Sequence, residues 1–134
     1  MADPLPLTVH HPDHAARHLV PLVITADTSV DEAMAAIKPL ATFNGSTLGL
    51  VRFEGRTPWE IHDDDEFLLI VDGDIHLEIL NPDGGELRGV ASTGQVVVVP
   101  AKHWHRQDAP TGGTVMFITG PNGDVSKQED PRRA

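Results

Sequence analysis

The chain has 134 residues, no cysteine and a formal net charge of −10, from 20 acidic and 10 basic residues. This length is that of one domain, and the absence of cysteine excludes disulfides, zinc fingers and thiol catalysis. The acidic balance argues against a nucleic-acid partner, because a phosphate backbone needs a basic surface, and it favours a small molecule or a cation.

The N-terminal stretch MADPLPLTVHHPDH has no basic region leading into an apolar run, so it does not read as a secretory signal. The run HLVPLVITA is too short to span a bilayer and contains Pro21. We therefore expect a cytoplasmic protein with no membrane partner. The first 20 residues are polar, carry several histidines without apolar periodicity and predict a flexible arm. These histidines are His10, His11, His14 and His18.

A helix is predicted within SVDEAMAAIKPL. Ser29 and Glu32 form a capping-box pattern, Ala-rich sequence follows, and Pro39 stops the helix. Next along the chain, Asn44-Gly45 stands between two β-prone runs, which indicates a hairpin.

Beyond residue 40 the apolar runs are short and are separated by turn residues, which is typical of an all-β barrel or sandwich. The predicted strands are 47–53, 66–71, 74–80, 87–91, 95–100 and 114–119. Gly73, in the turn VDGD, is expected to fold strand 66–71 back on strand 74–80. The chain is interpreted as a single domain, 1–134. It has an N-terminal arm and helix (1–40), a barrel (41–120) and a C-terminal tail (121–134).

The stretch PWEIHDDDE carries the first group of candidate site residues. Residues two apart in an extended segment point to the same side, so Glu60 and His62 share a face. Glu66 opens the next strand, close to His62. The three aspartates between them, 63–65, are interpreted as a solvated turn that discourages edge pairing.

The stretch AKHWHRQDAP carries the second group, with His103 and His105 on one face. If strand 95–100 pairs within the same barrel, His105 approaches His62 and Glu66. Imidazole and carboxylate ligands suit Zn, Fe, Mn, Ni or Cu, and two histidines with one carboxylate form a known metal-binding arrangement. The alternative is a polar barrel mouth in which these side chains form hydrogen bonds with one another and no metal is present.

The two stretches together resemble the paired motifs of the cupins. The first motif is matched by Gly55, then Glu60-Ile61-His62, Glu66 and Gly73. The second is matched by Gly94, Pro100-Ala101-Lys102, His105 and Ala109. The resemblance extends over residues 47–126, and two spaced motifs are more specific than one.

This resemblance implies a small jelly-roll barrel, or double-stranded β-helix, with a metal at its mouth and a homodimeric assembly. It implies that His62, Glu66 and His105 match three of the four metal ligands of the family. The expected cofactor is one divalent ion: Fe, Mn, Zn or Ni.

The sequence departs from the family pattern at three positions: Glu60 replaces a histidine, Lys102 a glycine and Ala109 an asparagine. A second glutamate neutralises the charge of a divalent site, so bound water and substrate are polarised less, and harder metals are preferred. Glu60 either is the fourth ligand or acts as an acid/base group. A degenerate site without metal is the other interpretation.

Four further residues are expected to lie outside the ligand set. His103 is interpreted as a rim residue and His76 as an outward-facing strand residue. Trp59 and Trp104 are expected to pack outside the barrel or in a dimer interface rather than to line a pocket.

These observations support three functions. The first is a metal-dependent enzyme, of dioxygenase, isomerase or decarboxylase type, acting on a small oxygenated molecule. A pocket with polar groups such as Arg52, Lys102 or Gln107 would support it. The second is a non-catalytic cupin that binds or senses a small ligand, with a structural or absent metal. The third is a structural dimer with its barrel filled by Phe53, Phe67 or Phe117.

Overall fold

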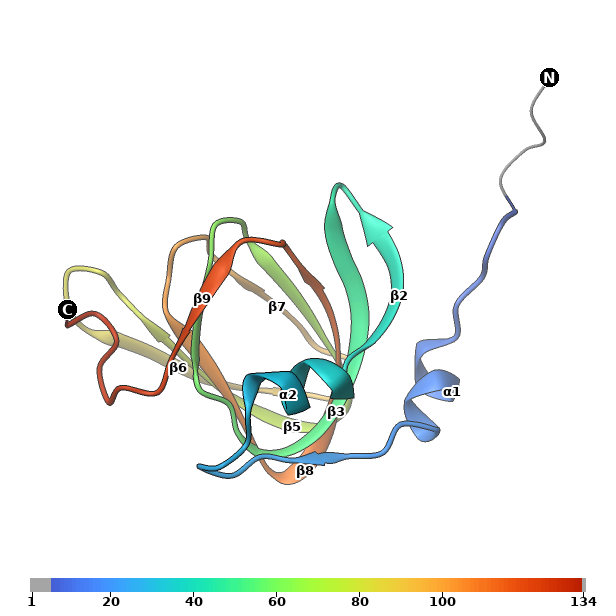
Figure 1. Ribbon diagram of the computed structural model, residues 1–134, viewed down its shortest axis with the longest axis horizontal. Coiled ribbons are helices and arrows are strands. Elements are labelled where there is room, and N and C mark those ends of the chain that lie inside the picture. Colours follow the sequence, from blue (N-terminus) through green and yellow to red (C-terminus); the bar gives the residue numbers. More distant parts are fainter. Residues whose placement is uncertain (1–5, 134) are drawn as a thin grey trace.

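The computed structural model describes residues 6–133, which form a curled β-sheet with two short helices beside it (Figure 1). The elements in chain order are α1 (Pro12–Arg17), β1 (Leu22–Val23), α2 (Val30–Ala36), β2 (Lys38–Phe43), β3 (Ser46–Arg56), β4 (Trp59–His62), β5 (Glu66–Leu80), β6 (Glu86–Ser92), β7 (Val96–Val99), β8 (His105–Thr119) and β9 (Gly123–Ser126). The expected all-β jelly-roll architecture is confirmed.

Two long strands, β5 and β8, organise the barrel. Each has 15 residues, and they pair antiparallel along both of their halves. The other edge of β5 pairs first with β7 and then with β6. The other edge of β8 pairs with β3 and, at its start, with β4. Because both long strands serve two neighbours in succession, the sheet curls around a common core.

The prediction that Gly73 reverses the chain was wrong. Residues 66–80 form one strand, β5, whose register with β8 shifts between Gly73 and His76. Gly73 has φ +96, and a Cβ there would lie 2.7 Å from the carbonyl oxygen of Gly112. A glycine with positive φ serves a turn or a bend in a continuous strand equally well, and only the tertiary pairing decides between them.

The helix and the hairpin of the N-terminal half are confirmed. Ser29 caps α2 and accepts a hydrogen bond from the backbone N–H of Glu32, whose side chain accepts one from the N–H of Ser29 in return. The helix ends at Ala36, ahead of Pro39. Asn44 and Gly45, with φ of 50 and 77, join β2 to β3.

The segments interpreted as arm and tail also contribute structure. The short strand β1 runs parallel to β3, and β9 pairs antiparallel with β4 over all four of its residues. Helix α1 lies in the histidine-rich stretch, where Ala16 is buried. Residues 1–5 lie outside the described part of the chain.

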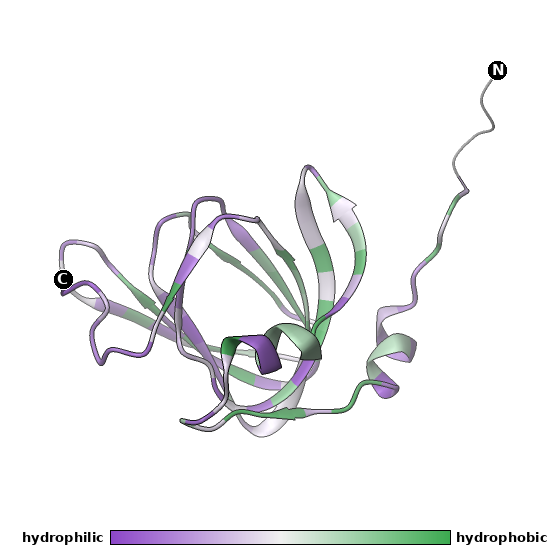
Figure 2. Cartoon of the chain, viewed as in Figure 1, coloured by the Kyte–Doolittle hydropathy of each residue, from purple (hydrophilic) through white to green (hydrophobic). Residues whose placement is uncertain are grey.

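The core lies between the two halves of the curled sheet. Strand colouring by hydropathy shows hydrophobic residues alternating with hydrophilic ones along the long strands (Figure 2). The buried hydrophobic cluster consists of Phe53, Leu68, Ile70, Ile75, Leu77, Ala91, Val99, Ala109, Val115 and Phe117. Two of the three phenylalanines considered as barrel fillers thus lie in the core, whereas Phe67 is only half-buried. Within residues 6–133, no helix has the length and hydrophobicity to cross a membrane.

Candidate metal centre

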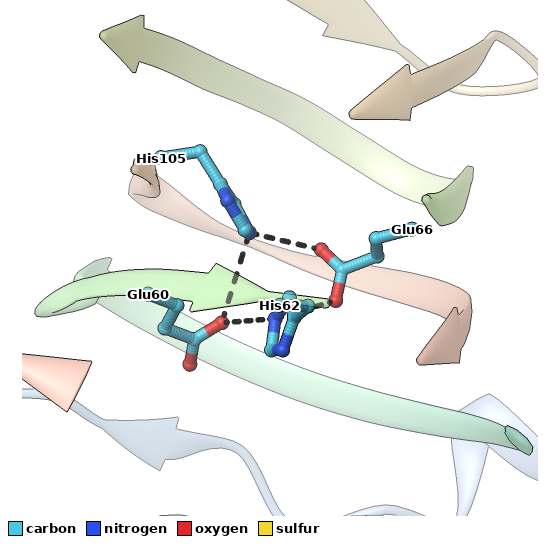
Figure 3. Close-up of side chains that lie close together, drawn as sticks. All are labelled: Glu60, His62, Glu66 and His105. Carbon is cyan, nitrogen blue, oxygen red and sulfur yellow. Dashed lines mark hydrogen bonds and ion pairs between the residues drawn. The ribbon is translucent and has the colours of Figure 1, made fainter. Parts of the chain in front are cut away.

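Four side chains that lie on three strands point toward one another (Figure 3). Glu60 and His62 project from β4, Glu66 opens β5 and His105 opens β8. One ligand atom from each of the four lies within 4.8 Å of all the others. We call this set the four-residue cluster.

In the cluster, the Nε2 atom of each histidine lies close to a carboxylate oxygen of both glutamates. Nε2 of His62 lies 3.6 Å from Oε2 of Glu60 and 3.3 Å from Oε2 of Glu66. Nε2 of His105 lies 3.2 Å from Oε1 of Glu66 and 3.9 Å from Oε2 of Glu60. Each imidazole therefore faces both carboxylates, and the two rings are 5.3 Å apart between centroids.

The backbone and a threonine hold the two most buried members in place. Nδ1 of His105 lies 3.0 Å from the carbonyl oxygen of His103, so Nδ1 carries the proton and Nε2 points into the cluster. The hydroxyl of Thr119 donates to Oε2 of Glu66 over 2.6 Å. Such outer contacts fix the orientation of ligating side chains.

His62 contributes a buried nitrogen that makes no aligned hydrogen bond within the described chain. Its Nε2 is buried and has no aligned hydrogen-bond partner, although both carboxylates face it. The carboxylates of Glu60 and Glu66 outweigh burial and raise the pKa of His62 to about 10. Buried polar atoms in proteins are almost always paired, so this nitrogen marks a place for a further ligand.

Neighbouring opposite charges also shift the pKa values of the other two buried groups, Glu66 and His105. Burial raises the pKa of Glu66, but contacts with His105, His62 and Thr119 outweigh it and lower this pKa to about 2. Burial lowers the pKa of His105, but the adjacent Glu66 carboxylate outweighs the effect of burial, so the pKa of His105 is raised overall. Two negative carboxylates thus attract positive charge to this spot.

The cluster fits a divalent metal ion. Metal–ligand distances of about 2.0–2.2 Å place neighbouring ligand atoms roughly 2.9–3.6 Å apart, depending on the coordination geometry. The four observed nitrogen–oxygen distances, 3.2 to 3.9 Å, lie close to this range. Two imidazoles and two carboxylates are also a donor set that first-row divalent metals accept.

The neighbours of the cluster show which other sequence assignments hold. His103 lies beside the cluster, where its Nδ1 contacts the carbonyl oxygen of Ala101 over 2.8 Å. Asp65, interpreted as part of a solvated turn, also accepts a hydrogen bond from the N–H of Ala101 over 2.8 Å. This link between the two motif stretches was missed, because a side chain to backbone contact 36 residues away leaves no local pattern.

Lys102 occupies the position where the cupin motif has glycine. Its φ is +61, in the left-handed region, and its N–H donates to the carbonyl oxygen of His62 over 2.8 Å. The backbone at this position therefore needs the conformation that glycine adopts without strain. This turn ties the second motif stretch to β4.

Two of the polar residues expected in a pocket serve other roles. Arg52 donates to the carbonyl oxygen of Leu19 over 3.3 Å. Lys102 is exposed and borders a shallow depression beside Asn122. Gln107 has a buried side-chain oxygen that lacks a hydrogen-bond partner among the described residues.

The two tryptophans differ in their surroundings. Trp59 is 3% exposed, its Nε1 donates to the carbonyl oxygen of Glu129, and the guanidinium of Arg106 lies 4.1 Å from its ring centroid. It thus packs under Arg106 and the C-terminal segment, but it also lines a cavity there, so the expectation that it lines no pocket was wrong. Trp104 is half-buried, and His76 is exposed as predicted.

A cavity of about 440 Å³ lies next to the cluster. Its walls come from the β1–α2 segment, α2, the start of β4 and the end of β9, and Glu60 forms part of one wall. Sequence reasoning missed this cavity, because most of its walls come from segments interpreted as arm and tail.

The sequence matches no protein-family model, and no curated protein sequence is significantly similar to it. Many solved structures resemble the fold. One is hydroquinone 1,2-dioxygenase from Sphingomonas sp. TTNP3 with 4-hydroxybenzoate bound. It has a TM-score of 0.53 and 22% sequence identity, and the similarity covers 63% of this chain and 65% of that one. The chain thus spans just under two thirds of that protein's length.

Two further structures cover more of the chain. A hydroquinone 1,2-dioxygenase in complex with Cd²⁺ and 4-hydroxybenzonitrile has TM-score 0.58 and 17% identity, over 91% of this chain and 83% of that one. A cupin-2 domain protein from Shewanella frigidimarina has TM-score 0.55 and 19% identity, over 70% of this chain and 94% of that one. At these identities the similarity establishes the fold.

Proposed function

Because the chain is a cupin by fold, we propose that it holds one divalent metal ion through Glu60, His62, Glu66 and His105 and uses it to act on a small oxygenated molecule. One observation carries this proposal. Four metal-ligand side chains converge within 4.8 Å, and one of their nitrogens is buried without an aligned partner. A cation placed among them satisfies that nitrogen and both carboxylates at once.

The donor set favours Fe²⁺ or Mn²⁺ among the divalent ions. Two carboxylates and two neutral imidazoles compensate the charge of the ion fully, and carboxylate oxygens suit harder metals better than nitrogen does. When bound, the metal supplies a Lewis acid that polarises an oxygen atom of the ligand.

Glu60 is the member of the cluster best placed to move a proton. Its side chain is 33% exposed, whereas those of Glu66 and His105 are 5% and 1% exposed. It therefore stands between the buried ligands and the cavity. Near a phenol or an alcohol bound there, its carboxylate accepts a proton that the buried members cannot reach.

The reaction proposed is oxygenation of a small phenolic or hydroxylated compound. Two of the structures with this fold are hydroquinone dioxygenases, bound to 4-hydroxybenzoate and 4-hydroxybenzonitrile. Since fold and reaction are inherited separately, this similarity supports the choice of reaction to test first.

Oxygen uptake tests this proposal. Untagged protein is loaded separately with Fe²⁺, Mn²⁺, Zn²⁺ or Ni²⁺, and oxygen consumption is followed with hydroquinone. We expect uptake with Fe²⁺ or Mn²⁺ that His105→Ala abolishes and that the exposed-site variant His76→Ala retains. Metal binding without uptake, for hydroquinone or other small phenols, would contradict the oxygenase reaction.

A non-catalytic cupin that binds a small ligand is the second candidate. It is favoured by the neutral charge of the proposed site, because a less positive metal polarises a ligand less. Phe53 and Phe117, which lie in the core, instead favour the structural dimer with a filled barrel. Saturable ligand binding by the metal-loaded protein, with no product by mass spectrometry, would support this candidate.

We also propose that the chain forms a homodimer through β6 and β7. Three large apolar side chains on the outer face of these strands are 53–57% exposed: Val90, Val96 and Val98. Such a patch on two neighbouring strands is typical of an interface. A mass of one chain by light scattering at micromolar concentration would contradict it.

A further inference from the structure

The cavity beside Glu60 has an unusual share of the positive charge of this acidic protein. Three of its lining residues are basic, Arg56, Arg106 and Lys127, and one is acidic, Glu60. The chain has twice as many acidic as basic residues, 20 against 10. The lining therefore reverses the charge balance of the rest of the molecule, which favours an anion.

Two of the three cations are available to a ligand. Arg106 is already paired with Glu78, at 3.1 Å between Nη2 and Oε2. Arg56 is exposed and has no ion pair within residues 6–133. The ammonium of Lys127 donates to two carbonyl oxygens, of Ala26 and Thr28, each over 3.3 Å, and contacts no carboxylate there.

One wall of the cavity is apolar and is left uncovered by the described part of the chain. Val30, Ala33 and Met34 of α2 line it, at the i, i+3 and i+4 positions that share one helix face. No residue of α2 is buried, and Val30 and Met34 are 54% and 62% exposed. Figure 2 shows hydrophobic colour along most of α2 beyond its acidic first turn. A helix normally buries its apolar face, so the exposed apolar face of α2 is available to contact a ligand.

The cavity also has the size of a small-molecule site and lies beside the four-residue cluster. Its volume of about 440 Å³ falls in the range of about 300–1,000 Å³ that small-molecule sites occupy. α2 and β9 border it together at one end of the barrel (Figure 1). Glu60 belongs both to this lining and to the four-residue cluster, so a molecule in the cavity lies directly beside the proposed metal.

We infer that this cavity binds a small organic carboxylate with an apolar, ring-sized body. The carboxylate lies at Arg56 and the remaining ammonium hydrogen of Lys127, and the apolar body covers Val30 and Met34. The end opposite the carboxylate reaches Glu60. This inference rests on the proposed function, since Glu60 is what connects the ligand to the metal.

Benzoate and its neutral analogue benzamide test the inference in the full-length, ¹⁵N-labelled protein. Titration is followed by backbone amide chemical shifts, and the metal content of every sample is measured in parallel. We expect benzoate to shift the amides of 30–36 and 127–128 and to bind about tenfold more tightly than benzamide, as charge-assisted contacts predict.

Two variants and one control identify the contacts. Arg56→Gln is expected to weaken benzoate binding about fivefold or more, and Met34→Gln to weaken benzoate and benzamide alike. Arg88→Gln replaces an exposed arginine of β6 and should bind as the unchanged protein does. Equal affinities for benzoate and benzamide, or equal effects of Arg56→Gln and Arg88→Gln, would overturn the inference.

The metal measurement separates the two proposals. Metal-loaded protein that does not bind benzoate contradicts the anion cavity alone. Protein that takes up no metal even after incubation with each divalent ion, yet binds benzoate in an Arg56-dependent manner, contradicts the metal site and supports the anion cavity.

Discussion

Nε2 of His105 lies 3.2 Å from Oε1 of Glu66, and both side chains are almost completely buried, at 1% and 5% exposure. The two residues are 39 positions apart in sequence, so the contact joins the starts of the long strands β5 and β8. In their antiparallel ladder these two starts lie at opposite ends, so the contact links them across the curled sheet and forms part of the cluster.

Removing one partner of this pair should destabilise the metal-free protein. We expect Glu66→Ala to lower the free energy of unfolding by about 3–5 kcal/mol, since a buried charge is left without its partner. Urea denaturation measures the change. The control is Asp63→Ala, an exposed neighbour, for which a change within about 0.5 kcal/mol is expected. Equal effects of the two substitutions would contradict the role of the buried pair.

Metal affinity should rise with pH. The pKa of His62 in the metal-free protein is raised to about 10, so below that pH a metal must displace a proton from this ring. We expect the affinity to increase roughly tenfold per pH unit between about pH 7 and 9 for each proton released. Calorimetry in buffers of different ionisation enthalpy counts the protons. Metal binding that releases none would rule out coordination by His62.

Exchanging Glu60 for the histidine of the cupin motif should change metal preference. Glu60→His replaces an oxygen donor by nitrogen and leaves a divalent site with one positive charge. We expect the affinity for Zn²⁺ relative to Mn²⁺ to increase by at least about tenfold. Competition titrations with both ions measure the ratio. If Glu60→His and Glu60→Gln give the same ratio, residue 60 is not a ligand.

A glycine of β9 should matter to the site through its closeness to β4. A Cβ at Gly123 would lie 2.7 Å from Nδ1 of His62, so Gly123→Ala must push β9 or His62 aside. We expect the free energy of unfolding to fall by about 1–3 kcal/mol, together with weaker metal binding. Gly89→Ala is the matched control, because a Cβ there meets nothing within 4 Å. Unchanged metal affinity in Gly123→Ala would show that β9 does not support the site.

The sequence predicted those parts of the fold whose signals are local. The capping box at Ser29, the hairpin at Asn44-Gly45 and most strand positions depend on neighbouring residues, and the structure confirms them. The bend at Gly73 was misread as a reversal, because pairing with β8 rather than local chemistry decides the path of β5.

The four members of the cluster were also named from the sequence, and the structure brings them together. The spacing in β4 and the two motif stretches carried enough information for that. The cavity beside Glu60 was not foreseen, because Arg56, Met34 and Lys127 come from three distant segments. Their proximity follows from where β9 and α2 pack, which no local pattern encodes.

Metal content tests the proposed metal site most directly. Untagged protein is expressed unchanged and as His62→Ala, Glu60→Ala and the exposed control His76→Ala, and each is measured by plasma mass spectrometry. We predict close to one metal ion per chain in the unchanged protein and in His76→Ala, with the metal lost from His62→Ala and from Glu60→Ala. Absence of metal from the unchanged protein and all three variants, even after incubation with each divalent ion, would contradict the metal centre. The clustered side chains would then only form hydrogen bonds and ion pairs with one another.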